Sequence, residues 1–419
     1  MDAVDVEVWA DWRGLSGPTR LGLLSGAVVR NRETFRFAYD DAWLKRRGPA
    51  LALDPRLAHV AGPQYPRPEH GLFGLFLDSC PDRWGRVLLQ RREAARAKRE
   101  GRRARRLRTW DYLLGVFDPH RMGGLRVRVE AGGAFLDDDA AFASPPWTRL
   151  RELVAISLRL EREGVEDAPE YVRWLSMLIA PGRSVGGARP KASVVDDEGR
   201  LWIAKFPSRE DTEDVGAWEA VAHDLAKCAG IDVPVARCQR IGHEHHTFMS
   251  RRFDRVGSER LHMASAMTLL ERIDGETDGA SYLHLAEVLI QRGGAPEADL
   301  EQLWRRIAFN VCVSNVDDHL RNHAFLLTDE GWRLAPAYDM NPVPWGDGLS
   351  LDISDLDNAQ DLDLVREVAP FFRVNAGRAR QIVEEVVAAV RSWRTVAAAR
   401  GIGRNAQERM APAFRIAEA

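Results

Sequence analysis

One stretch near residue 320 constrains this chain more than any other, because it joins a polar loop to a strand pair that folds back beside it. The loop is Asn315–His323, and it carries Asp317 and Asn322. Apolar residues on either side of a short turn predict a β-hairpin over residues 323–334. That hairpin would return a second carboxylate, Asp339, to the neighbourhood of Asn322. Clustered oxygen ligands of this kind are what Mg²⁺ prefers.

The spacing inside the loop adds a chemical hypothesis. Asp317 and Asn322 are five residues apart, as in protein-kinase catalytic loops, where the Asp handles the substrate hydroxyl and the Asn holds magnesium. A later Asp binds metal in those enzymes, and Asp339 could fill that role. Asp318 is the rival for the catalytic carboxylate, although its spacing to Asn322 is one residue short. We expect His319 to shape the loop rather than to act as a base.

A glycine-containing passage upstream predicts the phosphate-binding half of such a site. Gly186-Gly187 precedes two apolar strands, and Lys205 lies in the second strand between apolar neighbours, where its charge needs a partner. Paired glycines let backbone N–H groups approach an anion, and a Lys on a strand can reach phosphates. The glycine pair alone is also typical of an ordinary turn. Glu219 borders the apolar stripe of the next predicted helix and could face inward there. It is the candidate partner of Lys205, with two unrelated surface charges as the alternative.

Composition limits the classes of protein to consider. A chain of 419 residues with 45% hydrophobic residues can bury a large core in two or three structural units. No apolar run approaches the roughly 18 residues of a membrane span, and the acidic start lacks the basic region of a signal peptide, so we expect a soluble, cytoplasmic protein. The net charge of -3 argues against a chain that is basic as a whole. The four cysteines lack a C-x-x-C pair and favour free thiols over a zinc site or a disulfide framework.

Two local clusters suggest ligands, and each has a simpler interpretation. Ten of the eighteen residues from Arg91 to Arg108 are Arg or Lys. This basic segment is interpreted as a solvated helix end or loop, with a surface for nucleic acid or an acidic partner as the alternative. The other cluster, His243, His245 and His246, resembles a metal site but flanks a predicted hairpin tip. We therefore expect these histidines to be exposed turn residues.

Apolar periodicity predicts the remaining elements. Alternation predicts a small antiparallel sheet within residues 1–45. Further strands are predicted at Ile231–Val235 and Phe248–Ser250, and amphipathic helices over residues 303–311 and 382–390. A connector at residues 251–255 would lead from the strands into a mostly helical part.

Together these residues resemble the HipA family, the serine/threonine kinase toxins of bacterial type II toxin–antitoxin modules. The resemblance runs over nearly the whole chain in matching order and spacing. Its motifs are Leu77–Arg83, Trp110–Gly115, Ser184–Lys191, Ile203–Lys205, Arg252–Arg255, Asp317–Asn322 and Ala335–Asp339. It implies an α+β, protein-kinase-like fold with two lobes. The implied parts are a small antiparallel-sheet subdomain at 1–135, a nucleotide-binding lobe at 136–254 and a mostly α-helical catalytic lobe at 255–419.

The resemblance also implies ATP and Mg²⁺ as cofactors. Lys205 would contact the ATP phosphates, Asp317 would be the catalytic Asp, and Asn322 and Asp339 would bind magnesium. The implied nucleotide-binding residues are Ser184, Val185, Gly186, Gly187, Ala188, Lys205, Glu219, Met249, Arg251, Phe253, His319, Asn322, Tyr338 and Asp339. Arg251 departs from the family, since the best-known relatives carry an acidic residue there.

Regulation and partners follow from the same resemblance. Autophosphorylation of Ser184 would add about -1.5 to -2 charges where the phosphates of the nucleotide should bind, and would switch the kinase off. The implied partners are a protein substrate such as an aminoacyl-tRNA synthetase and a HipB-like helix-turn-helix antitoxin, through which DNA would be contacted indirectly; no membrane is implied. Two alternatives remain: a small-molecule kinase, and a regulatory scaffold that binds antitoxin and operator through residues 91–108.

Overall fold

The structure is a computed structural model, and its described residues are 4–46, 53–129, 132–136, 143–162, 164–178, 189–273 and 279–419. They form two compact units. Unit 1 consists of Met1–Arg209, Asp254–Ala264 and Leu326–Asp329, and unit 2 of Glu210–Phe253, Ser265–Phe325 and Glu330–Ala419. The boundaries expected near residues 135 and 254 stay predictions.

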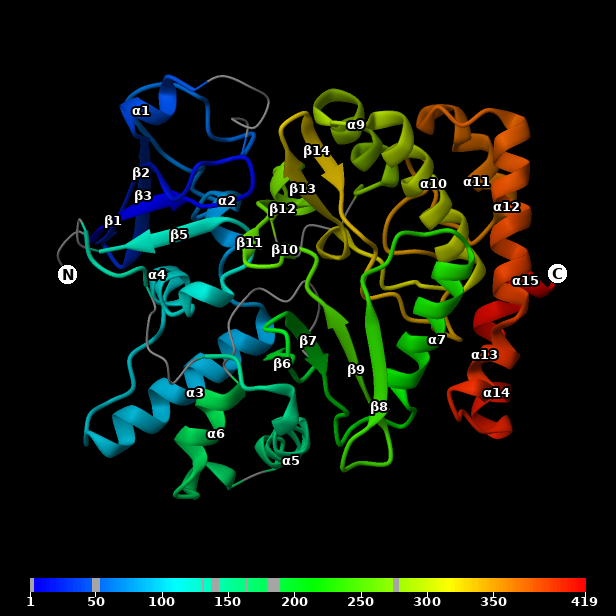
Figure 1. Cartoon of the computed structure of the whole chain (residues 1–419), viewed down its shortest axis with the longest axis horizontal. Helices are drawn as coiled ribbons and strands as arrows, with labels where there is room; N and C mark the ends of the chain where they lie inside the picture. The colour runs from blue at the N-terminus through cyan, green and yellow to red at the C-terminus, as the bar shows by residue number, and fades with distance from the viewer. Residues whose placement is uncertain are drawn as a thin grey trace. The chain divides into compact units, whose positions relative to one another are not determined.

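Unit 1 begins with a five-stranded antiparallel sheet in the order β4-β3-β2-β1-β5 (Figure 1). Its strands are β1 (Val4–Ala10), β2 (Thr19–Val29), β3 (Arg32–Tyr39), β4 (Pro63–Gln64) and β5 (Leu125–Arg128). Every second side chain of β1 from Val6 is buried, which confirms the predicted sheet. Gly22 of β2 permits close packing, since a Cβ there would lie 2.2 Å from the carbonyl oxygen of Ala38.

Helices and two antiparallel strand pairs complete unit 1. The helices are α1 (Asp41–Leu44), α2 (Gly74–Leu77), α3 (Arg83–Arg99), α4 (Thr109–Leu114), α5 (Leu150–Leu160) and α6 (Tyr171–Leu178). The antiparallel hairpin is β6 (Lys191–Val195) with β7 (Leu201–Lys205), followed much later in the chain by β10 (Arg255–Val256) and β11 (Glu259–Arg260). Asp82 caps α3 by accepting from the backbone N–H of Gly85 at 2.8 Å. Asp82 is therefore the N-cap of this long helix.

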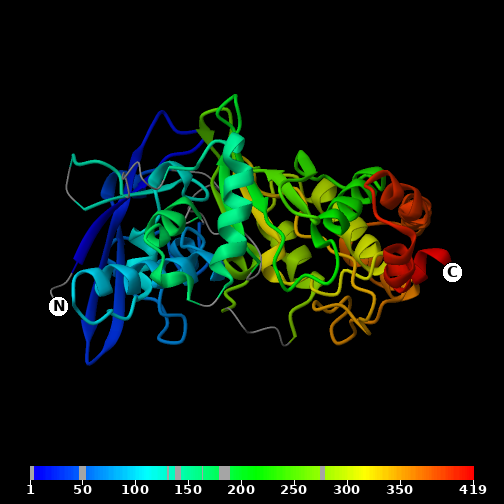
Figure 2. The same cartoon turned by 90° about the horizontal axis from the view of Figure 1, so that it is seen from below.

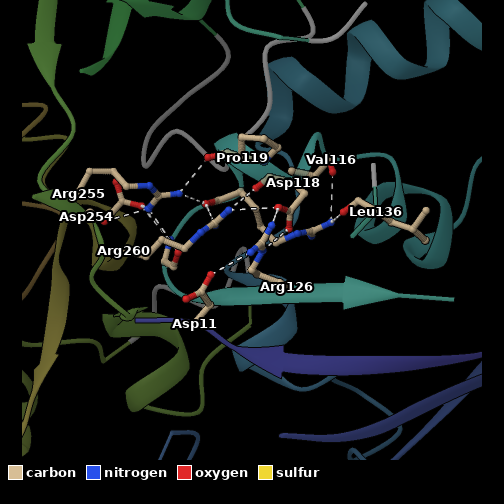
Figure 3. Close-up of polar contacts among 11 residues, drawn as sticks. Asp11, Val116, Asp118, Pro119, Arg126, Leu136, Asp254, Arg255 and Arg260 are labelled. Atoms are coloured by element: carbon tan, nitrogen blue, oxygen red, sulfur yellow. Dashed lines mark hydrogen bonds and ion pairs between the residues drawn. The ribbon is translucent and has the colours of Figure 1, made fainter. Parts of the chain in front are cut away.

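A buried ion network holds the β10–β11 hairpin to the sheet subdomain of unit 1 (Figure 3). Asp118, 2% exposed, accepts from Arg126 Nε at 2.9 Å, and its carbonyl oxygen accepts from Arg260 at 2.8 Å. Asp254 in turn pairs with Arg255 at 2.6 Å. Buried charges need such partners, because an unpaired one is very costly. The Arg252–Arg255 motif is thus anchored through its last two residues.

Unit 2 is mostly helical. Its strands are β8 (Ala236–Arg240), β9 (His246–Arg251) and β14 (Gly331–Leu334); β12 (Met263–Ser265) and β13 (Ala324–Thr328) each contribute to both units. Its helices are α7 (Val215–Cys228), α8 (Ala266–Leu269), α9 (Tyr282–Arg292), α10 (Pro296–Cys312), α11 (Leu362–Val368), α12 (Ala376–Arg391), α13 (Trp393–Ala399), α14 (Arg404–Met410) and α15 (Arg415–Glu418). The helix α12 packs along α10, and α13 and α15 contact α12 near the C-terminus of the chain (Figures 1 and 2).

Two local predictions in unit 2 are wrong. Ile231–Val235 forms no strand, and β8 starts at Ala236 instead. Pro234 cannot donate to a strand ladder, and its carbonyl oxygen lies 2.7 Å from His223 Nε2. The histidines between β8 and β9 are half-buried rather than exposed, and His246 Nδ1 lies 2.6 Å from Asp214 Oδ2.

The described residues contain neither a membrane-spanning helix nor a metal-binding cluster of His, Cys, Asp or Glu. Within these ranges, no helix has both the length and the apolar character needed to cross a bilayer. The same residues contain no group of three or more His, Cys, Asp or Glu side chains placed to hold a metal ion.

Candidate active site

The candidate loop follows directly from α10, as the apolar spacing over residues 303–311 predicts. The helix ends where Ser314 adopts a left-handed backbone conformation, with φ of +49°. The next residue closes the turn, since the N–H of Asn315 donates to the carbonyl oxygen of Asn310 at 2.9 Å. Because only a few non-glycine residues adopt positive φ, such a residue marks a constrained turn. The loop therefore leaves a rigid helix end in a fixed direction.

The two neighbouring aspartates of the loop have opposite environments. Asp317 is exposed, whereas Asp318 is 4% exposed. One oxygen of the Asp318 carboxylate, Oδ2, lies 2.5 Å from the hydroxyl of Tyr282, 2.9 Å from Asn310 Nδ2 and 2.9 Å from His323 Nε2. An ionised carboxylate only accepts hydrogen bonds, so all three groups donate to it. Asp318 thus anchors the loop, whereas the carboxylate of Asp317 stays exposed.

The electrostatics of this anchor agree with its geometry. Burial disfavours the charge of Asp318, but attraction to His323 and hydrogen bonds from His323 and Tyr282 outweigh it and hold its pKa below the usual range. The pKa of Tyr282 is raised well above its usual value by burial and by the nearby Asp318. The phenol therefore stays protonated as a donor while the carboxylate stays charged.

Asn322 offers an unused oxygen ligand. Its Nδ2 donates to the carbonyl oxygen of Asp317 at 3.2 Å, which fixes the amide and spans the predicted five-residue interval. Its Oδ1 is buried and has no hydrogen-bond partner among the described residues. A buried amide oxygen without a donor is unfavourable unless a cation or water completes it. The donor set therefore fits Mg²⁺, which prefers hard oxygen ligands.

The hairpin after the loop returns the chain as predicted. The strands β13 and β14 are joined by a turn, and the N–H of Ala335 donates to the carbonyl oxygen of Ala324 at 2.9 Å. Asp339 then adopts a left-handed conformation with φ of +59°. Asn341 Nδ2 lies 3.5 Å from Asp339 Oδ1, and the buried Oδ1 of Asn341 accepts no hydrogen bond within the described part of the chain. Strained residues and unused oxygens concentrate at functional sites.

Two hydrogen bonds tie the segment around Asp339 to the loop. The N–H of Asn341 donates to Asn315 Oδ1 at 3.1 Å, and the hydroxyl of Tyr338 donates to the carbonyl oxygen of Arg321 at 2.9 Å. Loop and hairpin are therefore held together on both sides of Asp339. The sequence predicted that the segment around Asp339 would lie beside the loop that carries Asn322.

The residues expected on the nucleotide side form a second group in unit 2. The rings of Phe253 and Tyr338 stack, with centroids 5.5 Å apart and planes 25° apart. Met249 is buried on β9, and Arg251 ends that strand half-buried. The stacked pair thus places the connector after β9 next to the residue that precedes Asp339. His319, 9% exposed, has an Nδ1 without a hydrogen bond inside the described ranges.

The structure describes only some of the residues expected to bind phosphate. Lys205, 9% exposed, ends β7 in unit 1 and lies opposite Lys191 in the β6–β7 hairpin. Lys191 forms its own ion pair with Asp82 at 3.1 Å. Glu219 is 3% exposed on α7 of unit 2, so its side chain faces inward as expected. Ser184, Val185, Gly186, Gly187 and Ala188 lie outside the described residues, so the pairing of Lys205 with Glu219 and the role of the loop stay predictions.

Sequence reasoning missed the groups that hold the loop. These are Tyr282, Asn310, Asn315, His323 and Asn341. One signal was present: Asn310 is a polar residue in the apolar stripe of α10, where a buried amide needs a partner. Tyr282 had no such signal, because it comes from a distant part of the chain.

Comparison with known protein families identifies the family of this chain. The chain matches the HipA-like C-terminal domain over residues 183–394, just over half its length, and the HipA N-terminal domain over residues 21–109. Two curated proteins named as putative kinases are similar: Y4dM of Sinorhizobium fredii, 27% identical over 36% of this chain, and a protein of Haemophilus influenzae, 27% identical over 39%. These matches span only 39% and 54% of the relatives' own lengths.

A solved structure extends the similarity to the whole fold. It is described as the Shewanella oneidensis MR-1 toxin–antitoxin system HipA, HipB and its operator DNA complex. It covers 99% of this chain and 96% of the other at 16% identity, with a TM-score of 0.64. The α+β, kinase-like HipA fold expected from the motifs is thereby confirmed. From the domain matches, this chain belongs to the HipA family.

Proposed function

We propose that this chain is an ATP- and Mg²⁺-dependent serine/threonine protein kinase that acts as the toxin of a toxin–antitoxin module. The observation that carries the proposal is the loop itself, in which Asp317 is exposed while the buried Oδ1 of Asn322 has no hydrogen-bond partner in the part of the chain that the structure describes. Family membership and the kinase names of two relatives support it. The Shewanella oneidensis HipA was solved together with HipB and operator DNA, which supports a HipB-like antitoxin as the partner of this chain.

The chemistry assigned to the chain is mostly positioning. Asp317 would accept a hydrogen bond from the incoming hydroxyl and take its proton as the oxygen–phosphorus bond forms, while the bond between the γ-phosphorus and its bridging oxygen breaks and ADP leaves. Asp318 keeps the loop in place by accepting hydrogen bonds from Tyr282, Asn310 and His323. Lys205 would neutralise phosphate charge of the bound nucleotide. Phe253 and Tyr338 would present their apolar rings to the adenine side.

Asn322 and Asp339 are the residues that would hold magnesium. The bound metal would neutralise phosphate charge as it develops. The protein's own contribution is to fix those oxygens in advance, through the bond from Asn322 Nδ2 to the carbonyl of Asp317 and the constrained backbone of Asp339. Preorganised ligands need little rearrangement during the reaction.

The direct test uses purified chain, γ-labelled ATP, Mg²⁺ and cell lysate. The parent should label itself and at least one protein, with an aminoacyl-tRNA synthetase as the first candidate. Asp317→Asn should abolish both signals while keeping the parent's stability, because the side chain is exposed. Labelling that survives this substitution would contradict the kinase assignment, and label found only on a metabolite would favour a small-molecule kinase.

Autoinhibition through Ser184 is part of the proposal. Mass spectrometry of the labelled chain should locate phosphate at Ser184, and Ser184→Ala should stay active for longer and be more toxic in cells. Equal toxicity of variant and parent would contradict autoinhibition while leaving the kinase assignment in place.

The scaffold alternative depends on the basic segment 91–108. Part of its charge is already neutralised, since Arg102 pairs with Glu93 at 2.6 Å and Arg105 pairs with Asp111 at 2.8 Å. These pairs favour the solvated-surface interpretation. Salt-dependent DNA binding by the chain alone would instead support the scaffold.

A further inference from the structure

An acidic segment follows Asn341 and has no role in the site described so far. We define it as residues 342–363. It contains six aspartates and no Lys or Arg. The aspartates are Asp347, Asp352, Asp355, Asp357, Asp361 and Asp363. Asp363 is paired with Arg366 at 2.5 Å, and the remaining aspartates in so short a stretch make a negative surface.

The acidic segment lies directly against the catalytic loop. The carbonyl oxygen of Val316, the residue before Asp317, accepts from the N–H of Ser350 at 3.0 Å and from its hydroxyl at 2.7 Å. Gly346 packs so closely on Val316 that a Cβ would lie 2.2 Å from Cγ1. The segment is therefore a direct neighbour of the residue that would receive the substrate hydroxyl.

Hydrogen bonds give the acidic segment a fixed shape although most of it lacks helix or strand. The N–H of Tyr282 donates to the carbonyl oxygen of Asp352 at 3.0 Å, which ties the segment to the start of α9. At the other side, Gln360 Nε2 donates to the carbonyl oxygen of Gly346 at 3.1 Å, and Arg415 donates to Gln360 Oε1 at 2.9 Å. A preformed surface binds a partner with little ordering cost.

The acidic segment exposes aromatic and aliphatic side chains among its charges. Trp345 is 77% exposed and Leu356 is 92% exposed. Asp347 and Asp355, next to them in sequence, are exposed as well. Burial first, and then repulsion from Asp357, raise the pKa of Asp352, while His284 acts in the opposite direction. Exposed Trp flanked by charge is typical of an interaction surface.

We propose that the acidic segment is the docking surface for the acceptor polypeptide, and that it selects stretches in which Lys or Arg flank the accepting Ser or Thr. The inference rests on the proposed function. Charge complementarity favours a cationic partner, and a guanidinium or ammonium can also pack on the face of Trp345. Trp345 and Leu356 lie at separate points of the segment, so they could contact an extended peptide at two places, which one small cation could not do. Nucleic acid would be repelled by the carboxylates.

Binding without nucleotide tests the proposal independently of catalysis. The probes are two short fluorescent peptides, each with one Ser, in which either Lys and Arg or Glu and Asp flank that Ser. Anisotropy with the full chain should show binding of the basic peptide only. Asp347→Asn with Asp355→Asn should raise its Kd about fivefold, the scale of two lost exposed ion pairs. Trp345→Ala should raise it about fivefold through the lost cation–π contact.

A matched control removes two exposed acids elsewhere in unit 2, through Glu287→Gln on α9 with Glu384→Gln on α12. This control should leave the Kd unchanged, because those carboxylates lie outside the acidic segment. Binding of both peptides alike, no effect of the Asp347 and Asp355 substitutions, or equally tight competition by a polyamine of the same charge would each overturn the docking surface. A chain that binds the basic peptide but transfers no phosphate would refute the kinase assignment alone.

Discussion

Replacing Asp318 by Asn tests whether the buried aspartate anchors the loop. The substitution keeps the shape of the side chain but removes its charge. The Oδ2 of Asp318 now accepts from Tyr282, Asn310 and His323, at 2.5 to 2.9 Å. Hydrogen bonds to a charged group contribute about 1.5–3 kcal/mol each, although bonds that share one acceptor are not additive. Removing one partner from a buried ionic network usually costs about 3–5 kcal/mol, and we expect a loss in that range.

The assay should report on unit 2 by itself, because a chain of two units need not unfold in one step. Native-state hydrogen exchange, followed by mass spectrometry of peptides from α10 and β13, measures the local free energy of opening. Tyr282→Phe is the matched variant, since it deletes only one of the three donors. That variant should lose about 1 kcal/mol, the usual net value of one hydrogen bond.

The double variant completes the test. If Asp318 and Tyr282 act through one bond, their combined loss will be smaller than the sum of the single losses. Equal protection in the parent and in Asp318→Asn would refute the anchor. A loss no larger than that of Tyr282→Phe would show that the carboxylate accepts from one donor rather than three.

Three further predictions concern metal binding, acid stability and unit 1. Asn322→Ala should raise the Mg²⁺ concentration for half-maximal phosphoryl transfer by about tenfold or more, the scale seen when support of a metal site is lost; an unchanged titration would remove Asn322 from the metal site. Because the pKa of Asp318 is depressed in the folded chain, its stabilisation is complete above the unfolded value of about 3.9 and lost as pH falls through the folded value. The hydrogen-exchange protection of α10 should therefore fall less between neutral and acid pH in Asp318→Asn than in the parent. The same fall in both proteins would contradict this. Asp118→Asn should destabilise unit 1 by about 3 kcal/mol, since the buried carboxylate that pairs with Arg126 at 2.5 Å and with Arg260 at 3.4 Å loses its charge; thermal unfolding with no shift would show that the network contributes little.

Local patterns predicted the parts of the site that depend on neighbours in sequence. The helical spacing over residues 303–311 predicted α10, and the strand pair around the turn predicted the return of the chain to Asp339. Both follow from periodicities that a short segment carries by itself. The inward position of Glu219 was predicted in the same way, from its place beside an apolar stripe.

Contacts between distant segments were not predictable from the same patterns. Nothing in the sequence decides which of Asp317 and Asp318 is buried, because a loop has no periodicity. The decision comes from Tyr282 and Asn310, which supply donors to one carboxylate only. Apolar composition also misled at Ile231–Val235, where Pro234 lacks the N–H that a ladder requires.

The start of α9 links the two functions proposed for unit 2. Through its side chain, Tyr282 donates to Asp318, and through its backbone N–H it donates to the carbonyl oxygen of Asp352 in the acidic segment. The segment is thus held by main-chain bonds that substitutions at Asp347 or Asp355 leave intact. Those substitutions should change peptide affinity without changing exchange protection of α10, whereas Asp318→Asn should lower that protection first. Acceptor docking and loop anchoring therefore share a support but can be separated by experiment.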